Sequence, residues 1–140
     1  MSIKFFYDNI NYRVRRSGEI KRFLEKVIRN EGKIPGDLFF IFTDDKRLII
    51  INREFLKHDY FTDVIAFNNS DTETVNGEIY ISAETVKRNS GLYNVGYFEE
   101  TLRVMIHGVL HLCGYEDKDA NRKKIMTSRQ EAILNEFLER

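Results

Sequence analysis

Two histidines on a predicted helix are the residues of this sequence best suited to chemistry. His107 and His111 are four residues apart, a spacing that places both imidazoles on one face of an α-helix, where both can reach a single ion. Gly114 can end the helix and turn the chain back, which brings Asp117 toward the same ion. Two imidazoles and one carboxylate suit zinc or a similar divalent cation, and three protein ligands leave a coordination position open for water. The pattern therefore predicts a catalytic metal site rather than a closed structural one.

The same stretch allows other interpretations. Two histidines at this spacing also occur by chance in proteins without a metal, and Glu116 competes with Asp117 for the third ligand position. Zinc peptidases carry a glutamate as general base directly after the first histidine. Here that position is Gly108, which argues against a peptidase of that type.

The elements that must position these residues follow from apolar periodicity and turn residues. Strands are expected at residues 3–7, 37–43, 64–67 and 78–82. Helices are expected at residues 17–30 and 45–56, after Ser82, and at residues 98–113 and 119–139. Residues 32–36 are expected to form a short turn, and residues 68–77 a polar loop with no reason to be rigid. Strands alternate with helices and then helices dominate, which predicts an α/β or α+β domain whose single sheet is covered mostly on one side.

Length and composition bound the class of protein. The chain has 140 residues, which suits one domain. Lys plus Arg equals Asp plus Glu at 22 each, so overall charge does not make this a polyanion-coating protein, and a nucleic-acid contact requires a local patch. A single cysteine excludes a disulfide framework and suits a reducing compartment. With no apolar run long enough for a secretory signal or a membrane helix, we expect a soluble, cytoplasmic protein.

Three blocks of the sequence resemble the YbeY family of bacterial endoribonucleases. Residues 107–117 (HGVLHLCGYED) resemble the family signature H-G-x-L-H-L-x-G-Y-D-H. Residues 51–67 resemble L-N-x-x-Y-R-x-K-D-x-P-T-D-V-L-S-F, and residues 77–82 resemble G-D-I-x-I-S. The blocks occur in the family's order and at compatible spacing, so the resemblance covers nearly the whole chain.

The resemblance implies a function as well as a fold. It implies a single α+β domain over residues 1–140 with one small mixed sheet and a metal site on a central helix. One zinc ion would be held by His107, His111 and Asp117. The implied activity is cleavage of single-stranded ribosomal RNA, in processing of the 3′ end of 16S rRNA and in ribosome quality control. The implied partners are ribosomal RNA and the small ribosomal subunit, without membrane or DNA.

Two departures from the family pattern fall on functional positions. Asp117 stands where the family has a third histidine, and the added negative charge should make the metal a weaker Lewis acid, although carboxylates are ordinary zinc ligands. Leu56 stands where the family has an arginine expected to hold phosphate, which leucine cannot do. Arg53, about one turn earlier, and Lys57 and His58, which follow, are the alternatives.

Basic residues outside these blocks are further predicted contacts. Arg13 and Arg15 belong to the densest basic cluster and are predicted to follow an RNA backbone, with Tyr7 or Tyr12 as a stacking surface. The alternative for the cluster is a solvated edge.

Three further side chains near the two motifs are Arg103, Asp59 and Asp63. For these residues the sequence allows either a functional or a structural role. Arg103 lies beside the histidine face and is predicted to contact phosphate; its alternative is a salt bridge to Glu99 or Glu100. Asp59 and Asp63 are expected to brace the turn that carries their loop toward the metal.

Three functions remain to be distinguished. The first is a metal-dependent endoribonuclease in which Arg53 or Lys57 steadies the phosphate. The second is a non-catalytic ribosome-assembly factor that keeps the fold and the metal but has lost cleavage with the arginine. The third is a metal-dependent hydrolase of another substrate, such as an ester.

Overall fold

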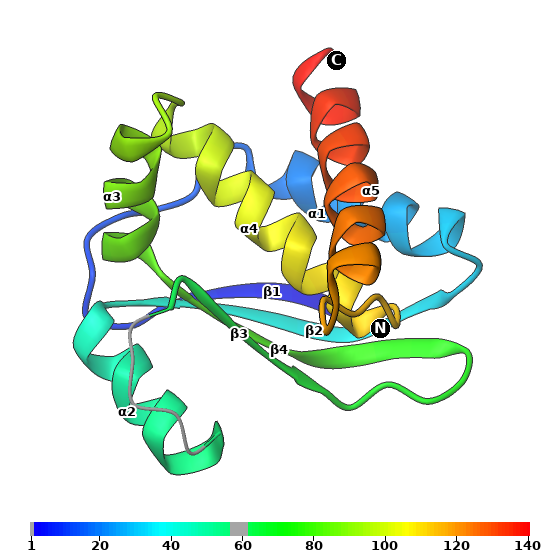
Figure 1. The fold of residues 1–140 in the computed structure, drawn as a ribbon, viewed down its shortest axis with the longest axis horizontal. Coiled ribbons are helices and arrows are strands. Elements are labelled where there is room, and N and C mark those ends of the chain that lie inside the picture. The colour runs from blue at the N-terminus through cyan, green and yellow to red at the C-terminus, as the bar shows by residue number, and fades with distance from the viewer. Residues whose placement is uncertain (1, 57–61) are drawn as a thin grey trace.

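Apolar segments of strand length and helical stripes alternate along the chain, and the structure forms an element from each of them (Figure 1). The computed structural model describes residues 2–56 and 62–140. Within these residues the elements are, in order, β1 (Ser2–Tyr7), α1 (Ser17–Asn30), β2 (Ile34–Thr43), α2 (Asp45–Leu56), β3 (Val64–Asn68), β4 (Thr74–Ser82), α3 (Ala83–Leu92), α4 (Tyr97–Leu112) and α5 (Ala120–Leu138). Each predicted strand and helix is present, with shifts at several ends.

The four strands found in the described ranges form one mixed sheet in the order β1-β2-β4-β3. β1 and β4 both run parallel to β2, whereas β3 runs antiparallel to β4. Parallel neighbours need a crossover connection, and α1 supplies the one between β1 and β2. The α+β class with one small mixed sheet is thereby confirmed.

The two faces of the sheet are covered unequally, as predicted. α1, α3, α4 and α5 lie on one side of the sheet and α2 on the other (Figure 1). The main core lies on the first side and includes the fully buried aromatic side chains Phe23, Phe40, Phe42 and Phe137. A smaller cluster of Leu48, Ile51 and Ile65 lies between α2 and the other face. Nowhere in residues 2–56 and 62–140 is a helix long and apolar enough to cross a membrane.

α4 is the central helix, and a glycine sets its distance from the sheet. A Cβ atom on Gly108 would lie 2.8 Å from Cγ2 of Ile79 in β4, and Ile79 is fully buried. Real Cβ contacts are essentially never that short, so the close approach of α4 to β4 requires a glycine at this position. The glutamate that zinc peptidases carry after the first histidine would not fit here.

The predicted turn at residues 32–36 is wrong at its second half. β2 begins at Ile34, and Pro35 pairs with Val75 of β4. The register shifts between Pro35 and Leu38, and strands tolerate a proline at such an irregularity because the ladder hydrogen bond is already lost there. The amide oxygen of Asn76 accepts a hydrogen bond from the backbone N–H of Asp37 at 2.8 Å and occupies the space beside Gly36.

The polar segment at residues 68–77 is also more ordered than predicted. β3 extends to Asn68, and β4 begins at Thr74. One carboxylate oxygen of Asp71 accepts hydrogen bonds from the backbone N–H groups of Glu73 and Thr74. The Ser70 hydroxyl contacts the backbone of Asn76. Polar side chains thus form the turn by bonding their own backbone, which composition alone does not reveal.

Candidate metal centre

Three predicted ligands lie together at the C-terminal end of α4. The rings of His107 and His111 have centroids 4.8 Å apart, as expected for one helical turn. Gly114 ends the helix with a φ of 108°, in the left-handed region that favours glycine. The reversed chain places Asp117 so that its Oδ2 atom is 3.7 Å from Nε2 of His111. One donor atom from each of the three residues lies within 4.8 Å of the other two.

Hydrogen bonds prepare both imidazoles to act as ligands. Nδ1 of His107 lies 2.7 Å from Oε1 of Gln130, and Nδ1 of His111 lies 3.1 Å from the carbonyl oxygen of Tyr115. Because both partners are acceptors, each Nδ1 carries the hydrogen and each Nε2 keeps a free lone pair. Burial, followed by the neighbouring His107, lowers the pKa of His111, which favours the neutral form that binds metal. The donor set therefore fits a divalent cation.

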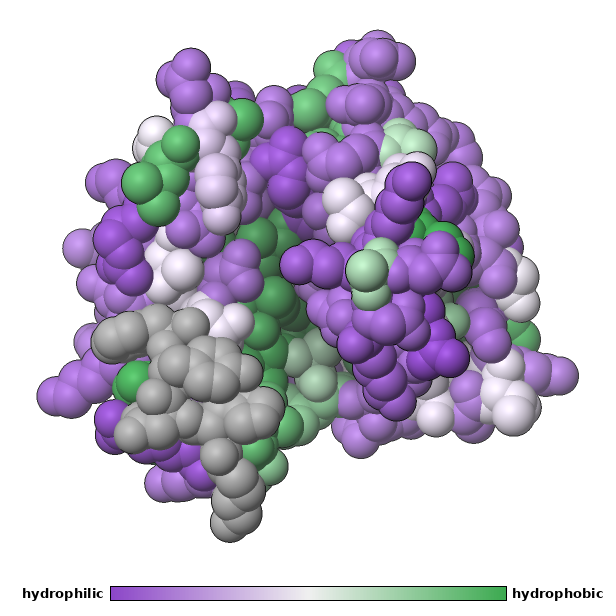
Figure 2. All heavy atoms as spheres, in the orientation of Figure 1, coloured by the Kyte–Doolittle hydropathy of each residue, from purple (hydrophilic) through white to green (hydrophobic). Residues whose placement is uncertain are grey.

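The three side chains face a pocket between α4, β3 and the end of α2. Its volume is about 650 Å³, and a hollow with apolar side chains on its floor is visible on this face of the molecule (Figure 2). Asn52 and Leu56 of α2 form one wall, and Asp117 and Lys118 belong to the segment after α4. The pocket combines an apolar floor with ligand atoms on one side, an arrangement typical of a small-molecule or substrate site.

Glu116, the competing third ligand, points to cations instead. Its carboxylate is 3.0 Å from Nη1 of Arg122 and 3.4 Å from Nζ of Lys118. Lys118 is the only lysine or arginine among the described residues that line the pocket. Sequence reasoning missed Lys118, and the available signal was its position directly after Asp117.

The described residues include only one of the predicted replacements for the family arginine, which is Arg53. Leu56 lines the pocket and is 38% exposed, so the position that the arginine would occupy faces the candidate site. Arg53 is exposed on α2 and is not among the described lining residues. Lys57, His58 and Asp59 lie outside the described residues.

Arg103 lies in a cluster of carboxylates. Its guanidinium is within hydrogen-bonding distance of Glu99, Glu100 and Glu131, and Glu100 is only 3% exposed. Burial raises the pKa of Glu100, opposed by the hydrogen bond from Arg103. The structure thus shows the salt-bridge alternative for Arg103, and a phosphate contact stays a prediction.

The basic cluster near the N-terminus packs on aromatic rings. Arg13 donates to the carbonyl oxygen of Ile10 and lies 4.4 Å from the centre of the Tyr7 ring. Arg15 lies 4.3 Å from the centre of the Phe98 ring. Tyr12 stacks on Tyr97 with ring centroids 4.4 Å apart. The tyrosines predicted to stack on RNA therefore already have internal partners, and contact between this cluster and RNA stays a prediction.

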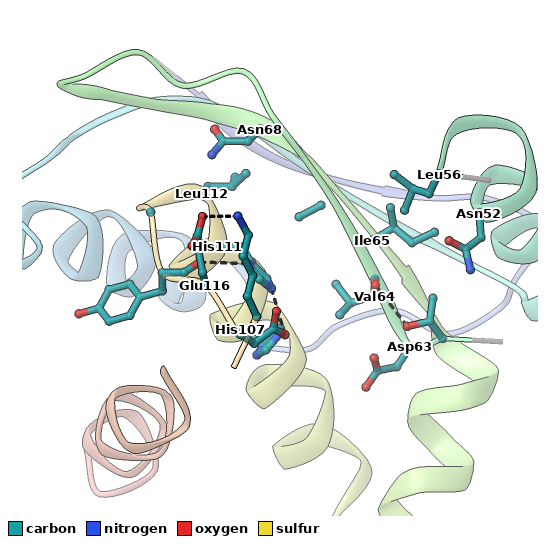
Figure 3. Close-up of a pocket in the computed structure, with 16 residues that line it drawn as sticks. Asn52, Leu56, Asp63, Val64, Ile65, Asn68, His107, His111, Leu112 and Glu116 are labelled. Carbon is teal, nitrogen blue, oxygen red and sulfur yellow. Dashed lines mark hydrogen bonds and ion pairs between the residues drawn. The ribbon is translucent and has the colours of Figure 1, made fainter. Parts of the chain in front are cut away.

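Asp63 supports the pocket from the opposite wall. It precedes β3, and its side chain lies across the pocket from His107 (Figure 3). Its backbone carbonyl oxygen accepts a 3.0 Å hydrogen bond from the backbone N–H of Ser82, which ties this segment to β4 through the main chain. Bracing of the turn by the Asp63 side chain stays a prediction. Burial raises the pKa of the Asp63 carboxyl, while backbone N–H groups and His107 lower it.

Two sequence comparisons with known proteins agree on one family. The sequence model described as "Endoribonuclease YbeY" matches residues 7–138. A protein named Endoribonuclease YbeY from Christiangramia forsetii is 42% identical over 135 residues, which cover 96% of this chain and 94% of that protein. One of the same name from Flavobacterium psychrophilum is 41% identical and covers 96% of each chain. A solution structure of a Thermotoga maritima protein superposes with a TM-score of 0.70 at 28% identity, covering 96% of this chain and 88% of that one.

Proposed function

Because the chain belongs to the YbeY endoribonuclease family, we propose that it is a zinc-dependent endoribonuclease that cleaves single-stranded ribosomal RNA. The observation that carries the proposal is the convergence of His107, His111 and Asp117, with one donor atom of each within 4.8 Å of the others beside a pocket. Residues 1–140 would form one metal-dependent hydrolase domain.

The proposed ligands are Nε2 of His107, Nε2 of His111 and a carboxylate oxygen of Asp117. When bound, a divalent cation of this type supplies Lewis-acid activation of water and neutralises charge on phosphoryl oxygens. Two imidazoles with one carboxylate are a donor set that zinc takes, and the same set also suits iron, nickel or manganese. The third ligand is an acid in place of an imidazole, so the site carries one more negative charge than a site built from three histidines.

We propose both the cations that hold the phosphodiester and the kind of RNA strand that is cleaved. Lys118 lines the pocket, and we propose it together with Arg53 and Lys57 as the cations that steady the phosphodiester in place of the family arginine. A single strand is the proposed substrate because in-line attack requires a backbone free to rotate, which a duplex restrains. Arg13 and Arg15 are proposed to contact the RNA backbone outside the pocket.

The proposed setting is ribosome maturation in the cytoplasm. The substrate would be the 3′ end of 16S rRNA in the small ribosomal subunit, as the family resemblance implies. A non-catalytic assembly factor is the second candidate function, and the observation that favours it is Leu56 at the wall of the pocket.

Cleavage of defined RNAs tests the proposal. The zinc-loaded protein is incubated with an end-labelled single-stranded RNA and with the same strand in a duplex, beside the His107→Ala variant and the matched Glu116→Gln control. We expect cleavage of the single strand by the parent and by Glu116→Gln, and none by His107→Ala. Binding to the small subunit without cleavage would favour the assembly factor. Turnover of a generic ester without RNA cleavage would favour the third class of function.

A further inference from the structure

We propose that Gln130 of α5, held by Glu131 and Arg103, is a positioning residue that fixes the neutral tautomer of His107 and so aims its Nε2 atom at the metal. The inference rests on the proposed function only in treating His107 as a metal ligand. It concerns side chains that neither the histidine motif nor the family blocks include.

The contact between α5 and α4 is short and specific. Oε1 of Gln130 lies 2.7 Å from Nδ1 of His107, across 23 positions of sequence. Gln130 is 8% exposed, so the amide is largely shielded from water. A buried polar contact of this kind is expensive to leave unmade, and it holds the imidazole in one orientation.

A second hydrogen bond decides which way the amide faces. Nε2 of Gln130 donates to Oε2 of Glu131 at 3.1 Å. A carboxylate can only accept, so the amide nitrogen must face Glu131 and the amide oxygen must face His107. The oxygen in turn accepts only from a protonated Nδ1, which leaves Nε2 of His107 without a hydrogen.

Arg103 fixes the carboxylate on which this orientation depends. Nε and Nη2 of Arg103 contact the two carboxylate oxygens of Glu131 at 2.9 and 3.2 Å, a bidentate pair that restrains the plane of the carboxylate. Burial raises the pKa of Glu131, but the hydrogen bonds from Arg103 and Gln130 together with the charge of Arg103 outweigh it and the net pKa is lowered, so Glu131 stays ionised and acceptor-only. Arg103 is itself anchored by the buried Glu100.

The two histidines are therefore oriented by different means. Nδ1 of His111 lies against the backbone carbonyl oxygen of Tyr115. A carbonyl oxygen can only accept a hydrogen bond, and a side-chain substitution does not change that. His107 depends on a side-chain amide, which has a donor end and an acceptor end and needs Glu131 and Arg103 to choose between them. Only His107 is expected to respond when this chain of contacts is altered.

The test is the tautomer of each histidine in the metal-free protein. Long-range ¹H–¹⁵N spectra, recorded at about pH 8 where an ordinary histidine is neutral, report which nitrogen carries the hydrogen. The variant is Gln130→Met, which keeps the length of the side chain and removes the amide. Gln130→Glu keeps an acceptor toward His107. Glu99→Gln is the matched control, since Glu99 also contacts Arg103 but not Gln130.

We expect the parent and Glu99→Gln to hold His107 in the form protonated at Nδ1. Gln130→Met should mix the two tautomers of His107 while leaving His111 unchanged, and its zinc affinity, measured by competition with a chelating dye, should fall about 10- to 100-fold. Gln130→Glu should restore the Nδ1-protonated form. An unchanged His107 signal in Gln130→Met, or an equal change in Glu99→Gln, would overturn the inference. Because the spectra need neither metal nor RNA, this result is independent of whether the protein cleaves RNA.

Discussion

The three donor side chains of the candidate metal centre depend on local structure to different degrees. The helical repeat places His107 and His111 on one face of α4, and the glycine turn that follows brings Asp117 beside them. Glu116 sits one residue earlier and is drawn toward Arg122 and Lys118. Asp117 and Glu116 are both carboxylates, so the type of side chain does not decide between them. At the residue scale, the ion pairs of Glu116 with Arg122 and Lys118 separate it from the proposed ligand.

Metal content checks this ligand set. The parent, purified without added metal or a histidine tag, is expected to bind about one equivalent of zinc after loading. His107→Ala and Asp117→Ala should lose it, because two ligands hold zinc poorly, whereas Glu116→Gln should keep it. Elemental analysis measures the result. Retention in Asp117→Ala together with loss in Glu116→Gln would show that Glu116 is the third ligand.

Leu56 offers a second test at the same scale. Leu56→Arg places a guanidinium at the pocket wall, where it can hold phosphate in a bidentate manner. We expect the rate of cleavage of single-stranded RNA under saturating substrate to rise by at least about tenfold.

Leu56→Gln is the control for that change, because it adds polarity without charge and should leave the rate near that of the parent. A rise in both variants would mean that the removal of leucine matters more than the added charge. Activity in Leu56→Arg with none at all in the parent would identify the natural protein as a non-catalytic member of the family.

At the scale of elements, the packing of α4 on β4 holds the histidines against the pocket. Gly108 makes that packing possible, since a Cβ atom there would meet two side-chain atoms of Ile79 at less than 3 Å. The short distance between α4 and β4 therefore requires a glycine directly after the first histidine. Gly108 has no side chain that could transfer a proton.

Gly108→Ala should accordingly destabilise the protein. The added methyl group must displace a buried isoleucine, and we expect the free energy of unfolding to fall by about 1–2 kcal/mol despite the better helix propensity of alanine. Gly91 of α3 is the matched control, because nothing lies within 4 Å of a Cβ atom there. Gly91→Ala should raise the free energy of unfolding by about 0.5–1 kcal/mol. Urea denaturation measures both, and stabilisation by both substitutions would contradict the packing argument.

At the scale of the whole molecule, Asp45 joins elements on opposite sides of the sheet. It begins α2, and its carboxylate accepts hydrogen bonds from Ser82 at the end of β4 and from Thr85 of α3. Its other oxygen is 2.7 Å from Nη2 of Arg88. α2 carries one wall of the pocket, so this junction also fixes the wall relative to the sheet.

The junction predicts a dependence of stability on pH. Burial raises the pKa of Asp45, but the hydrogen bonds from Ser82, Thr85 and Arg88 outweigh it, and the net pKa lies below the ordinary value of 3.8. A lowered folded-state pKa contributes stability that is fully present above the unfolded pKa and is lost as pH falls through the folded pKa. Asp45→Ala should lower the free energy of unfolding by about 2 kcal/mol at neutral pH.

The difference in the free energy of unfolding between the parent and Asp45→Ala should shrink as the pH falls from about 4. Urea denaturation at a series of pH values measures it. Asp44→Ala is the comparison, since Asp44 adjoins the junction but bonds Asn9 and the backbone of Arg47. A difference for Asp45→Ala that stays constant down to low pH would show that the charge of Asp45 contributes nothing.

The sequence by itself determined what depends on near neighbours. The apolar stripe of α1, the strands of the sheet and the pairing of His107 with His111 all follow from periodicity, because side chains three, four or two positions apart share a face whatever lies elsewhere in the chain. The reversal at Gly114 follows from local conformation for the same reason, and it is enough to bring Asp117 beside His111.

The tertiary structure decided what depends on distant partners. Gln130 meets His107 across 23 positions, Arg103 meets Glu131 across 28, and no local pattern specifies such contacts. The same applies to Pro35, which joins a strand because β4 lies beside it, and to the turn near Ser70, whose hydroxyl reaches the carbonyl oxygen of Leu112 across 42 positions. Hydrogen bonds and ion pairs form between whichever groups the fold brings together, so residue type predicts the capacity for a contact and only the fold selects the partner.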